Sequence, residues 1–538
     1  MRNKYLMPII LTACLAVGVK MGFHIAKSND VFSAYNQKNN GNLSCINDVF
    51  SLIDKEYVDT VDMKDLQVKA ITHVLESMDP HSEYIKPEIL NDVNDNLHGS
   101  FEGIGVSFRI EKDTITIINT IKGGPSEKVG ILAGDRIVYV GDTLVAGTKI
   151  TNKEVMRLLK GPKKTKVDLK IKRHGVAELI DFSIIRDVIP TYSVDVAYMI
   201  DENIGFIKLT KFSQTTHKEF ASAVKKLKSE GMTKLILDLR DNTGGYLGEA
   251  VGIVDEILAD NRLIVYTEGE HRDRSYVFSR HKGLWENDDV VVLINEGSAS
   301  ASEIVAGALQ DNDRGTIIGR RSFGKGLVQE QFDLGENGAI RLTIARYYTP
   351  TGRCIQKPFE GSKEEYLLEE YSRYTTGEMF SVDSIHFADS LKYVTPGGKI
   401  VYGGGGIMPD IYVPLKNDST HYFFNMMANN SILFQYAFDY SDMHRNDILK
   451  YGNVTAFGEE FVFTDAMFDE LMRRTEEKKI KGTEADKAKA RELSEPLFKA
   501  YVARNVFGDE AFYPLYEPMD EILQKAIEVL KDLEEIEG

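Results

Sequence analysis

The chain has 538 residues and carries 82 acidic and 65 basic side chains, so its formal net charge at pH 7 is −17. This length allows about three to five domains of ~100–200 residues each. The acidic excess argues against general nucleic-acid binding, which depends on clustered Lys and Arg. The cysteines Cys14, Cys45 and Cys354 lie far apart, which excludes a disulfide framework and a cysteine zinc site as organising features.

Charge is distributed unevenly along the chain. Residues 151–175 carry nine basic and two acidic side chains, whereas residues 517–538 carry eight acidic and two basic ones. A solvated surface is the simplest interpretation of both stretches.

The N-terminus has the pattern of a targeting segment. Arg2 and Lys4 are followed by fifteen residues without a charge. We expect residues 1–27 to be a membrane anchor or a signal segment that places the body of the chain on the periplasmic side of the cell envelope, anchored in the inner membrane. A cleaved signal peptide and lipidation at Cys14, which ends a lipobox-like sequence, are the alternatives to an uncleaved anchor.

The region 28–98 begins with a polar tether and continues as a helical region. Residues 49–75 have apolar side chains at helical spacing. From residue 99 the pattern changes to a compact module of short strands and two helices. The expected strands lie at 108–118, 136–140 and 166–171, a short helix can start at 125–129, and a longer helix lies at 153–159.

Two apolar strands, at 234–239 and 289–295, are each followed by a turn rich in small residues and then by a helix. Strands that are apolar on both faces and alternate with helices predict a mostly parallel sheet. A hairpin is expected at 327–334 and 340–348, and beyond residue 415 the chain becomes helical and charged.

Small residues crowd the second strand-to-helix junction, at 295–303, so that backbone can approach a substrate closely. A serine at a helix N-terminus has free backbone N–H groups beside it, and such donors can stabilise a developing oxyanion. Serine is also an ordinary N-cap residue, and this stretch alone favours that interpretation.

A nucleophilic serine needs a base, and no Gly-x-Ser-x-Gly elbow or recognisable histidine triad is present. Lys325 lies in an otherwise uncharged stretch and can act as a base if burial lowers its pKa. Gln329 would share a strand face with Lys325 and could accept a hydrogen bond from its amine. A phosphate-binding loop is disfavoured, because Gly326 replaces the required Ser or Thr.

Two further Gly-rich segments could bind ligands through backbone N–H groups. Gly244 and Gly245 follow a parallel strand, so they should lie at the sheet edge that ligands favour. The alternative there is a turn that needs glycine for positive φ. The segment 103–106 opens the small module and could present N–H groups to a peptide carboxylate, with strand addition alongside. Nucleic-acid binding by this module lacks the interleaved aromatic residues that it requires.

Taken together, these motifs resemble the carboxy-terminal processing peptidases, which are serine-lysine peptidases of family S41. The resemblance spans about residues 45–413 and is carried by the segments 79–84, 101–108, 238–247, 297–309, 323–329 and 402–409. It implies a multidomain α/β fold. The expected parts are a crotonase-like βα peptidase core at 178–414, an inserted mostly-β PDZ domain at 99–177 and a helical C-terminal extension at 415–538.

The resemblance also implies roles for single residues. Ser300 would be the nucleophile, Lys325 the general base, and Gln329 the residue that orients Lys325. The oxyanion hole would comprise Gly244, Gly245 and Ala301. The PDZ carboxylate-binding loop would comprise Gly103, Ile104, Gly105 and Val106. Lys160 stands where many relatives of this family have Arg. Lysine keeps the positive charge at this position but lacks the bidentate geometry of arginine.

The implied function is that of a serine endopeptidase that binds protein C-terminal tails through its PDZ domain and hydrolyses peptide bonds, with no metal and no cofactor. Proteins or peptides with a free C-terminus are the expected substrates, and an adaptor protein, the inner membrane and a second copy of the chain are the other partners considered. The alternatives are a catalytically silent PDZ-bearing envelope scaffold and, more weakly, an acyl-CoA enzyme, which would leave Lys325 and the PDZ-like module unexplained.

Overall fold

The structure is a computed structural model that describes residues 44–280, 282–359, 362–416 and 421–537. The chain divides between Met78 and Asp79 into two compact units. The segment expected to enter the membrane, 1–27, lies outside the described residues. Among the residues that are described, no helix is both long enough and apolar enough to span a bilayer.

The described part of the first unit, residues 44–78, contains two helices, α2 (Ser44–Glu56) and α3 (Met63–Glu76). The helical spacing predicted at 49–75 is therefore interrupted between them. Asp62 caps α3, because its side chain accepts hydrogen bonds from the Lys64 and Asp65 backbone N–H groups.

The second unit begins with β1 (Glu83–Ile85) and α4 (Pro87–His98), which the sequence assigned to the N-terminal region. β1 pairs antiparallel with β18 (Ala339–Tyr348), so this segment is part of the larger unit. The sheet that contains β18 has the strand order β1-β18-β13-β14, with β17 (Leu327–Asp333) also paired to β18. Its other strands are β13 (Leu263–Gly269) and β14 (Arg272–Phe278).

A small β module lies between β2 (Ser100–Gly103) and β9 (Asp187–Pro190), which pair antiparallel at its root. Its sheet has the order β3-β4-β5-β7-β8, with β6 paired to β5. The strands are β3 (Val106–Glu111), β4 (Thr114–Thr120), β5 (Arg136–Val140), β6 (Thr143–Leu144), β7 (Lys166–Lys172) and β8 (Ile180–Ile185), and the helices are α5 (Pro125–Lys128) and α6 (Asn152–Leu159). Buried isoleucine, valine and leucine side chains form its own hydrophobic core.

The centre of the second unit is a six-stranded sheet of order β10-β11-β12-β15-β16-β21. Every neighbouring pair from β11 to β21 is parallel, and β10 is an antiparallel edge strand, so the predicted mostly parallel sheet is present. The strands are β10 (Val194–Met199), β11 (Ile204–Leu209), β12 (Lys234–Asp238), β15 (Asp289–Ile294), β16 (Thr316–Gly319) and β21 (Ile411–Tyr412).

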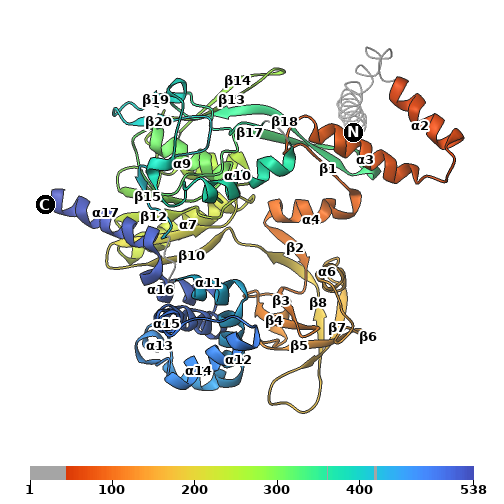
Figure 1. Cartoon of the computed structure of the whole chain (residues 1–538), viewed down its shortest axis with the longest axis vertical. Helices are drawn as coiled ribbons and strands as arrows, with labels where there is room; N and C mark the ends of the chain where they lie inside the picture. Colours follow the sequence, from red (N-terminus) through yellow and green to blue (C-terminus); the bar gives the residue numbers. More distant parts are fainter. Residues whose placement is uncertain (1–43, 281, 360–361, 417–420, 538) are drawn as a thin grey trace, which may run out of the picture. The chain divides into compact units, whose positions relative to one another are not determined.

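Helices cover both faces of this sheet (Figure 1). One face packs against α7 (Thr216–Glu230), α8 (Leu247–Asp255) and α9 (Ala301–Asp311) in the largest hydrophobic core. Alternate residues of the same strands, such as Ile236 and Leu293, point to the opposite face and pack against α17 (Glu521–Glu537). The α17 helix is therefore part of the core around the six-stranded sheet.

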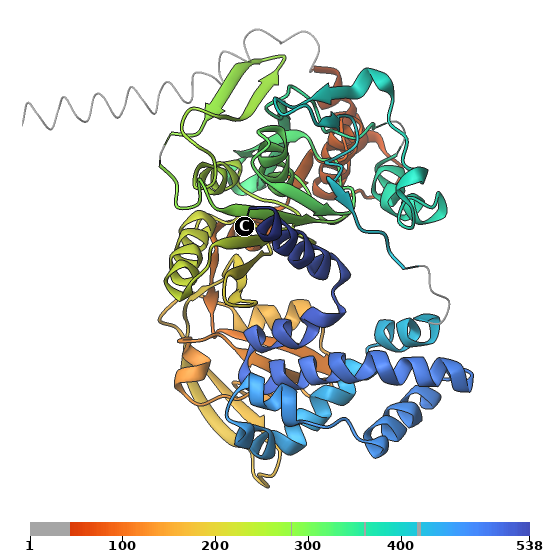
Figure 2. The same cartoon turned by 90° about the vertical axis from the view of Figure 1, so that its left-hand side faces the viewer.

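The extension forms a helical bundle of its own before it reaches α17 (Figure 2). The bundle comprises α11 (Tyr422–Asn429), α12 (Ile432–Ile448), α13 (Val454–Glu460), α14 (Asp465–Glu477), α15 (Glu484–Phe507) and α16 (Phe512–Tyr516). The mixed α/β fold with a β module and a helical C-terminal region agrees with the fold class expected from the sequence.

Substitution of Leu523 tests how strongly α17 stabilises the sheet that it covers. Leu523 is buried against the sheet, so Leu523→Ala should lower the free energy of unfolding by about 2–5 kcal/mol. Urea unfolding followed by the fluorescence of Trp285, the single tryptophan, reports on the core across the same sheet. Glu528→Ala, at an exposed position of α17, is the control and should change the stability by less than about 0.5 kcal/mol. Equal effects would contradict the packing role of α17.

Candidate active site

Ser300 is the N-cap residue of α9 and has a strained backbone, with φ of 56° and ψ of −111°. Non-glycine residues rarely adopt positive φ, and such conformations persist at a cost of about 1–3 kcal/mol when the surroundings impose them. The surroundings here include Glu303, whose Oε2 accepts a hydrogen bond from the Ser300 N–H at 2.8 Å. The expected nucleophile is therefore held in a sharp turn at the start of a buried helix.

Gly244 and Gly245 pass directly beside Ser300. A Cβ at Gly244 would lie 2.8 Å from the Ala299 carbonyl oxygen and 2.9 Å from the Ala301 nitrogen. Gly244 also has a φ of 97°. Both the close approach and the left-handed backbone require glycine at this position.

The three expected oxyanion donors differ in their availability. The Gly244 N–H donates to Asn242 Oδ1 at 2.9 Å and is already engaged. Within the described part of the chain, the N–H groups of Gly245 and Ala301 have no acceptor. The N–H groups of Gly245 and Ala301 are therefore free to bind an oxyanion. The N–H group of Gly244, which the sequence also suggested as an oxyanion donor, is instead bound to Asn242. The role of Gly244 is to let the turn approach Ser300.

Lys325 and Gln329 interact as the sequence predicts. Lys325 Nζ donates to Gln329 Oε1 at 2.9 Å, and Gln329 Nε2 donates to the His81 carbonyl oxygen at 2.5 Å. The second bond turns the amide so that its oxygen faces the amine. Burial lowers the pKa of Lys325, and the nearby positive charge of Arg341 lowers it further.

Ser300, Ala301, Lys325 and Gln329 line one cavity of about 680 Å³. Gly244, Gly245 and three residues of α4 line the same cavity. Among the described residues, no hydrogen bond joins the Ser300 hydroxyl to Lys325, although both residues line the same cavity.

Glu303 is the residue of this site that the sequence reasoning missed. Its fully buried carboxylate accepts hydrogen bonds from Ser300 N, Ser322 Oγ, Gly324 N and Lys325 N, at 2.8, 2.5, 2.7 and 2.9 Å. Burial raises the pKa of Glu303, while these hydrogen bonds act in the opposite direction. The pattern Ser-x-x-Glu from 300 to 303 is that of a capping box, which was the available signal.

Tyr347 and His81 also support the site and were not predicted. The Tyr347 hydroxyl lies 2.6 Å from the Lys325 carbonyl oxygen and 3.1 Å from that of Ser300, so it can donate to either. His81 Nε2 lies 2.9 Å from the Tyr366 hydroxyl, and burial together with the Lys325 charge lowers the pKa of His81 to about 4.

The loop Gly103–Val106 leads into β3 at the edge of the module's sheet. β3 pairs only with β4 among the described strands, which leaves its other edge open to an added strand. Ser126 fixes the loop, because its N–H and hydroxyl both donate to the Ile104 carbonyl, at 3.1 and 2.7 Å.

Lys160 connects the small β module to the helix that lines the cavity. Its Nζ lies 2.7 Å from Asp92 Oδ1 and 3.3 Å from Asp95 Oδ2, both on α4. Asn94, Leu97 and His98 of α4 line the cavity that contains Ser300. Lys160 therefore forms an ion-pair link between the small β module and α4.

Comparisons with known proteins assign families to three parts of the chain. Residues 203–363 match peptidase family S41, residues 103–184 match the PDZ domain, and residues 423–508 match a family of unknown function.

Among characterised relatives, a carboxy-terminal-processing protease of Bartonella bacilliformis is 39% identical over 58% of this chain and 72% of its own length. A carboxy-terminal processing protease of Bacillus subtilis is 34% identical over 61% of this chain and 70% of its own length. The solved PDZ domain of a carboxy-terminal protease from Vibrio cholerae, in complex with a peptide, is 33% identical over 17% of this chain and 97% of its own, with a TM-score of 0.16.

The lowered pKa of His81 predicts how stability depends on pH. In the unfolded chain His81 gains a proton as pH falls below its ordinary value of 6.5, whereas the folded protein resists protonation until about pH 4. The stability contributed by neutral His81 is therefore complete above pH 6.5 and is lost as pH falls toward 4. The urea midpoint, followed by Trp285 fluorescence, should fall less steeply over this window in His81→Gln than in the unsubstituted protein. Parallel curves would contradict this assignment.

Proposed function

The chain belongs to peptidase family S41 as a serine-type endopeptidase of the carboxy-terminal processing group, and we propose that Ser300 is its nucleophile and Lys325 its general base. The observation that supports this assignment is the cavity that Ser300 and Lys325 share, in which a buried lysine amine of lowered pKa donates to Gln329. The alternative of a catalytically silent scaffold is not favoured, because the relatives are proteases and Ser300, Lys325 and Gln329 are all present.

The proposed reaction is acyl transfer through a serine ester. Neutral Lys325 removes the Ser300 proton while Oγ attacks the substrate carbonyl, and the N–H groups of Gly245 and Ala301 bind the oxyanion that forms. Lys325 then returns the proton to the leaving amine, and a water molecule hydrolyses the acyl-enzyme with the same lysine as base. Catalytic hydrogen bonds often close only in the substrate complex, so we expect bound substrate to bring the Ser300 hydroxyl to Lys325.

Gln329 keeps the base oriented in this scheme. Its side-chain oxygen accepts from Lys325 Nζ, and its amide nitrogen is fixed by the His81 carbonyl oxygen. A neutral acceptor leaves the lysine pKa low, whereas a carboxylate in the same place would raise it.

The PDZ domain binds peptide substrates, and we propose that the loop Gly103–Val106 receives the carboxylate of a protein C-terminus while the tail adds to the open edge of β3. This geometry combines main-chain hydrogen bonds with carboxylate capture. The nine basic side chains at 151–175 lie in the same domain and would attract the negative end of the tail.

The cellular setting is part of the same proposal. Arg2, Lys4 and the uncharged stretch that follows support an N-terminal anchor in the inner membrane. The body would then act on the periplasmic side. For the extension we propose three alternative uses, which are binding of an adaptor protein, self-association and packing within the chain.

Substitution of the two proposed catalytic residues is the direct test. Ser300→Ala and Lys325→Ala should each lower cleavage of a peptide with a free C-terminus by about a thousandfold or more, because each removes a group required for acyl transfer. Ser222→Ala and Lys218→Ala, both on the exposed surface of α7, are matched controls and should retain full activity. Retained cleavage in both dyad variants would overturn the assignment.

Amidation of the substrate tests carboxylate recognition separately from cleavage. The Ser300→Ala protein should bind a free-carboxylate peptide about tenfold or more tighter than the same peptide with a C-terminal amide, because charge-assisted hydrogen bonds to the carboxylate are lost. Fluorescence anisotropy with a labelled peptide measures both affinities. Equal affinities would show that the tail is recognised without its carboxylate.

A further inference from the structure

The segment 321–325, which ends at Lys325, is held by charged side chains along both of its edges. On the amide edge, Glu303 accepts from the Gly324 and Lys325 N–H groups, at 2.7 and 2.9 Å. The carbonyl edge faces the opposite way, toward α10 (Lys363–Thr375), and needs a donor of its own.

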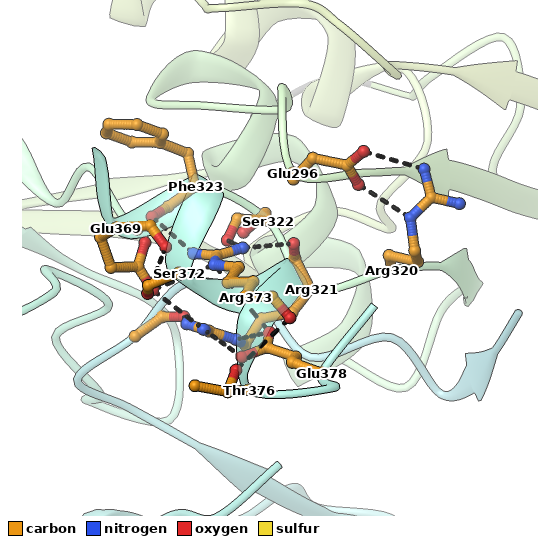
Figure 3. Close-up of polar contacts among 12 residues, drawn as sticks. Glu296, Arg320, Arg321, Ser322, Phe323, Glu369, Ser372, Arg373, Thr376 and Glu378 are labelled. Carbon is orange, nitrogen blue, oxygen red and sulfur yellow. Dashed lines mark hydrogen bonds and ion pairs between the residues drawn. The ribbon is translucent and has the colours of Figure 1, made fainter. Parts of the chain in front are cut away.

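That donor is Arg373, a side chain on α10 that is only 2% exposed. Figure 3 shows its guanidinium beside the segment. NH1 donates to the carbonyl oxygens of Arg321 and Ser322, at 3.0 and 3.1 Å, and NH2 lies 3.3 Å from that of Phe323. One arginine thus binds three consecutive carbonyl groups just before the proposed base.

The guanidinium is itself held in place by Glu369, one turn earlier on α10. Arg373 Nε donates to Glu369 Oε1 at 3.0 Å. Lys357 Nζ lies 3.0 Å from the other oxygen of the same carboxylate. Burial opposes ionisation of Glu369, but the hydrogen bond from Arg373 and the surrounding cations lower its pKa to about 2, so it stays charged and fixes the orientation of Arg373.

Arginine is required for this contact because its donors are arranged in a planar fork with a permanent charge. A lysine at 373 would retain the charge but would concentrate its donors at one atom, which cannot reach three successive carbonyl groups. The backbone of the segment would then be less constrained. The Lys325 side chain extends from this backbone to Gln329, so a shift of the backbone would also shift the amine.

We propose that Arg373 is a positioning residue for the general base: it fixes the segment 321–325 so that the Lys325 amine stays buried beside Gln329. The proposal rests on the role of Lys325 proposed above. The match to peptidase family S41 ends at residue 363, where α10 begins. The constraint on the base therefore comes from a helix beyond the matched region.

The matched control is Arg314, which also donates to three backbone carbonyl groups in the same core. Its Nε binds the Ile257 oxygen at 3.0 Å, and its NH2 binds those of Trp285 and Asp288, each at 2.6 Å. None of these three residues lies in a segment that carries a proposed catalytic group. Arg314→Lys removes the same kind of contact without acting on the base.

The test is the pH dependence of kcat for the full-length protein with Arg373→Lys. A base must be neutral to act, so activity rises with pH through the pKa of Lys325. If the segment loosens, water reaches the amine, its pKa rises, and the acid limb of the profile moves to higher pH. We expect that shift together with a kcat about 10- to 100-fold lower near neutral pH and a KM within about twofold. Arg314→Lys should lower thermal stability and leave the acid limb in place.

A second variant keeps the proposal testable if Arg373→Lys does not fold. Glu369→Gln leaves Arg373 present but less firmly oriented, so it should move the acid limb in the same direction by a smaller amount. An unmoved acid limb in a folded variant, or the same shift in Arg314→Lys, overturns the role of Arg373. Cleavage that persists in Lys325→Ala would instead refute the proposed base, so the two failures are distinguishable.

Discussion

The buried carboxylate of Glu303 is the interaction on which the candidate site depends. It lies in the first turn of α9 and accepts hydrogen bonds from the backbone of Ser300 on one side and of Gly324 and Lys325 on the other. A carboxylate without such partners would be costly to bury. Here four donors and the positive end of the helix dipole compensate for the loss of water. The same hydrogen bonds fix the strained turn at Ser300 and the segment that carries Lys325 relative to each other.

The parallel sheet supplies the second constraint, because the turns that follow β12 and β15 emerge at the same edge. Asp238 ends β12, and its carboxylate binds Arg240, which in turn binds Asp520 through two contacts of 2.7 Å. The positive charges of Arg240 and Lys208 keep the pKa of Asp238 below its usual range despite burial. Asp520 is one of the acidic residues at 517–538 that suggested only a solvated surface. In the fold it connects the extension to the turn that leads to Gly244 and Gly245.

Local patterns were sufficient to predict most strands, helices and the pair formed by Lys325 and Gln329, because alternation, helical spacing and an offset of four residues act over short distances. The strain at Ser300 could not be predicted, since Ser300 is surrounded by residues that are distant in the sequence, such as Gly244 and Tyr347. Arg373 was equally hidden, because its partners at 321–323 are about fifty residues away in the chain and no spacing rule connects them. The expectation for the Gly244 N–H differed from the structure because Asn242, two residues before it, competes for that donor.

A lysine that acts as a general base must be neutral, and the arrangement of charge around the proposed base Lys325 meets this requirement. An adjacent carboxylate would favour the ammonium form, so the direct partner of Nζ is the neutral amide of Gln329. Glu303 and Arg373 both bind the backbone of the segment rather than the amine. The carboxyl group of Glu303 meets N–H groups and the guanidinium of Arg373 meets carbonyl groups, so each side chain orients peptide dipoles. The segment is thereby fixed by hydrogen bonds on both of its edges, while burial remains the largest influence on the pKa of the Lys325 amine.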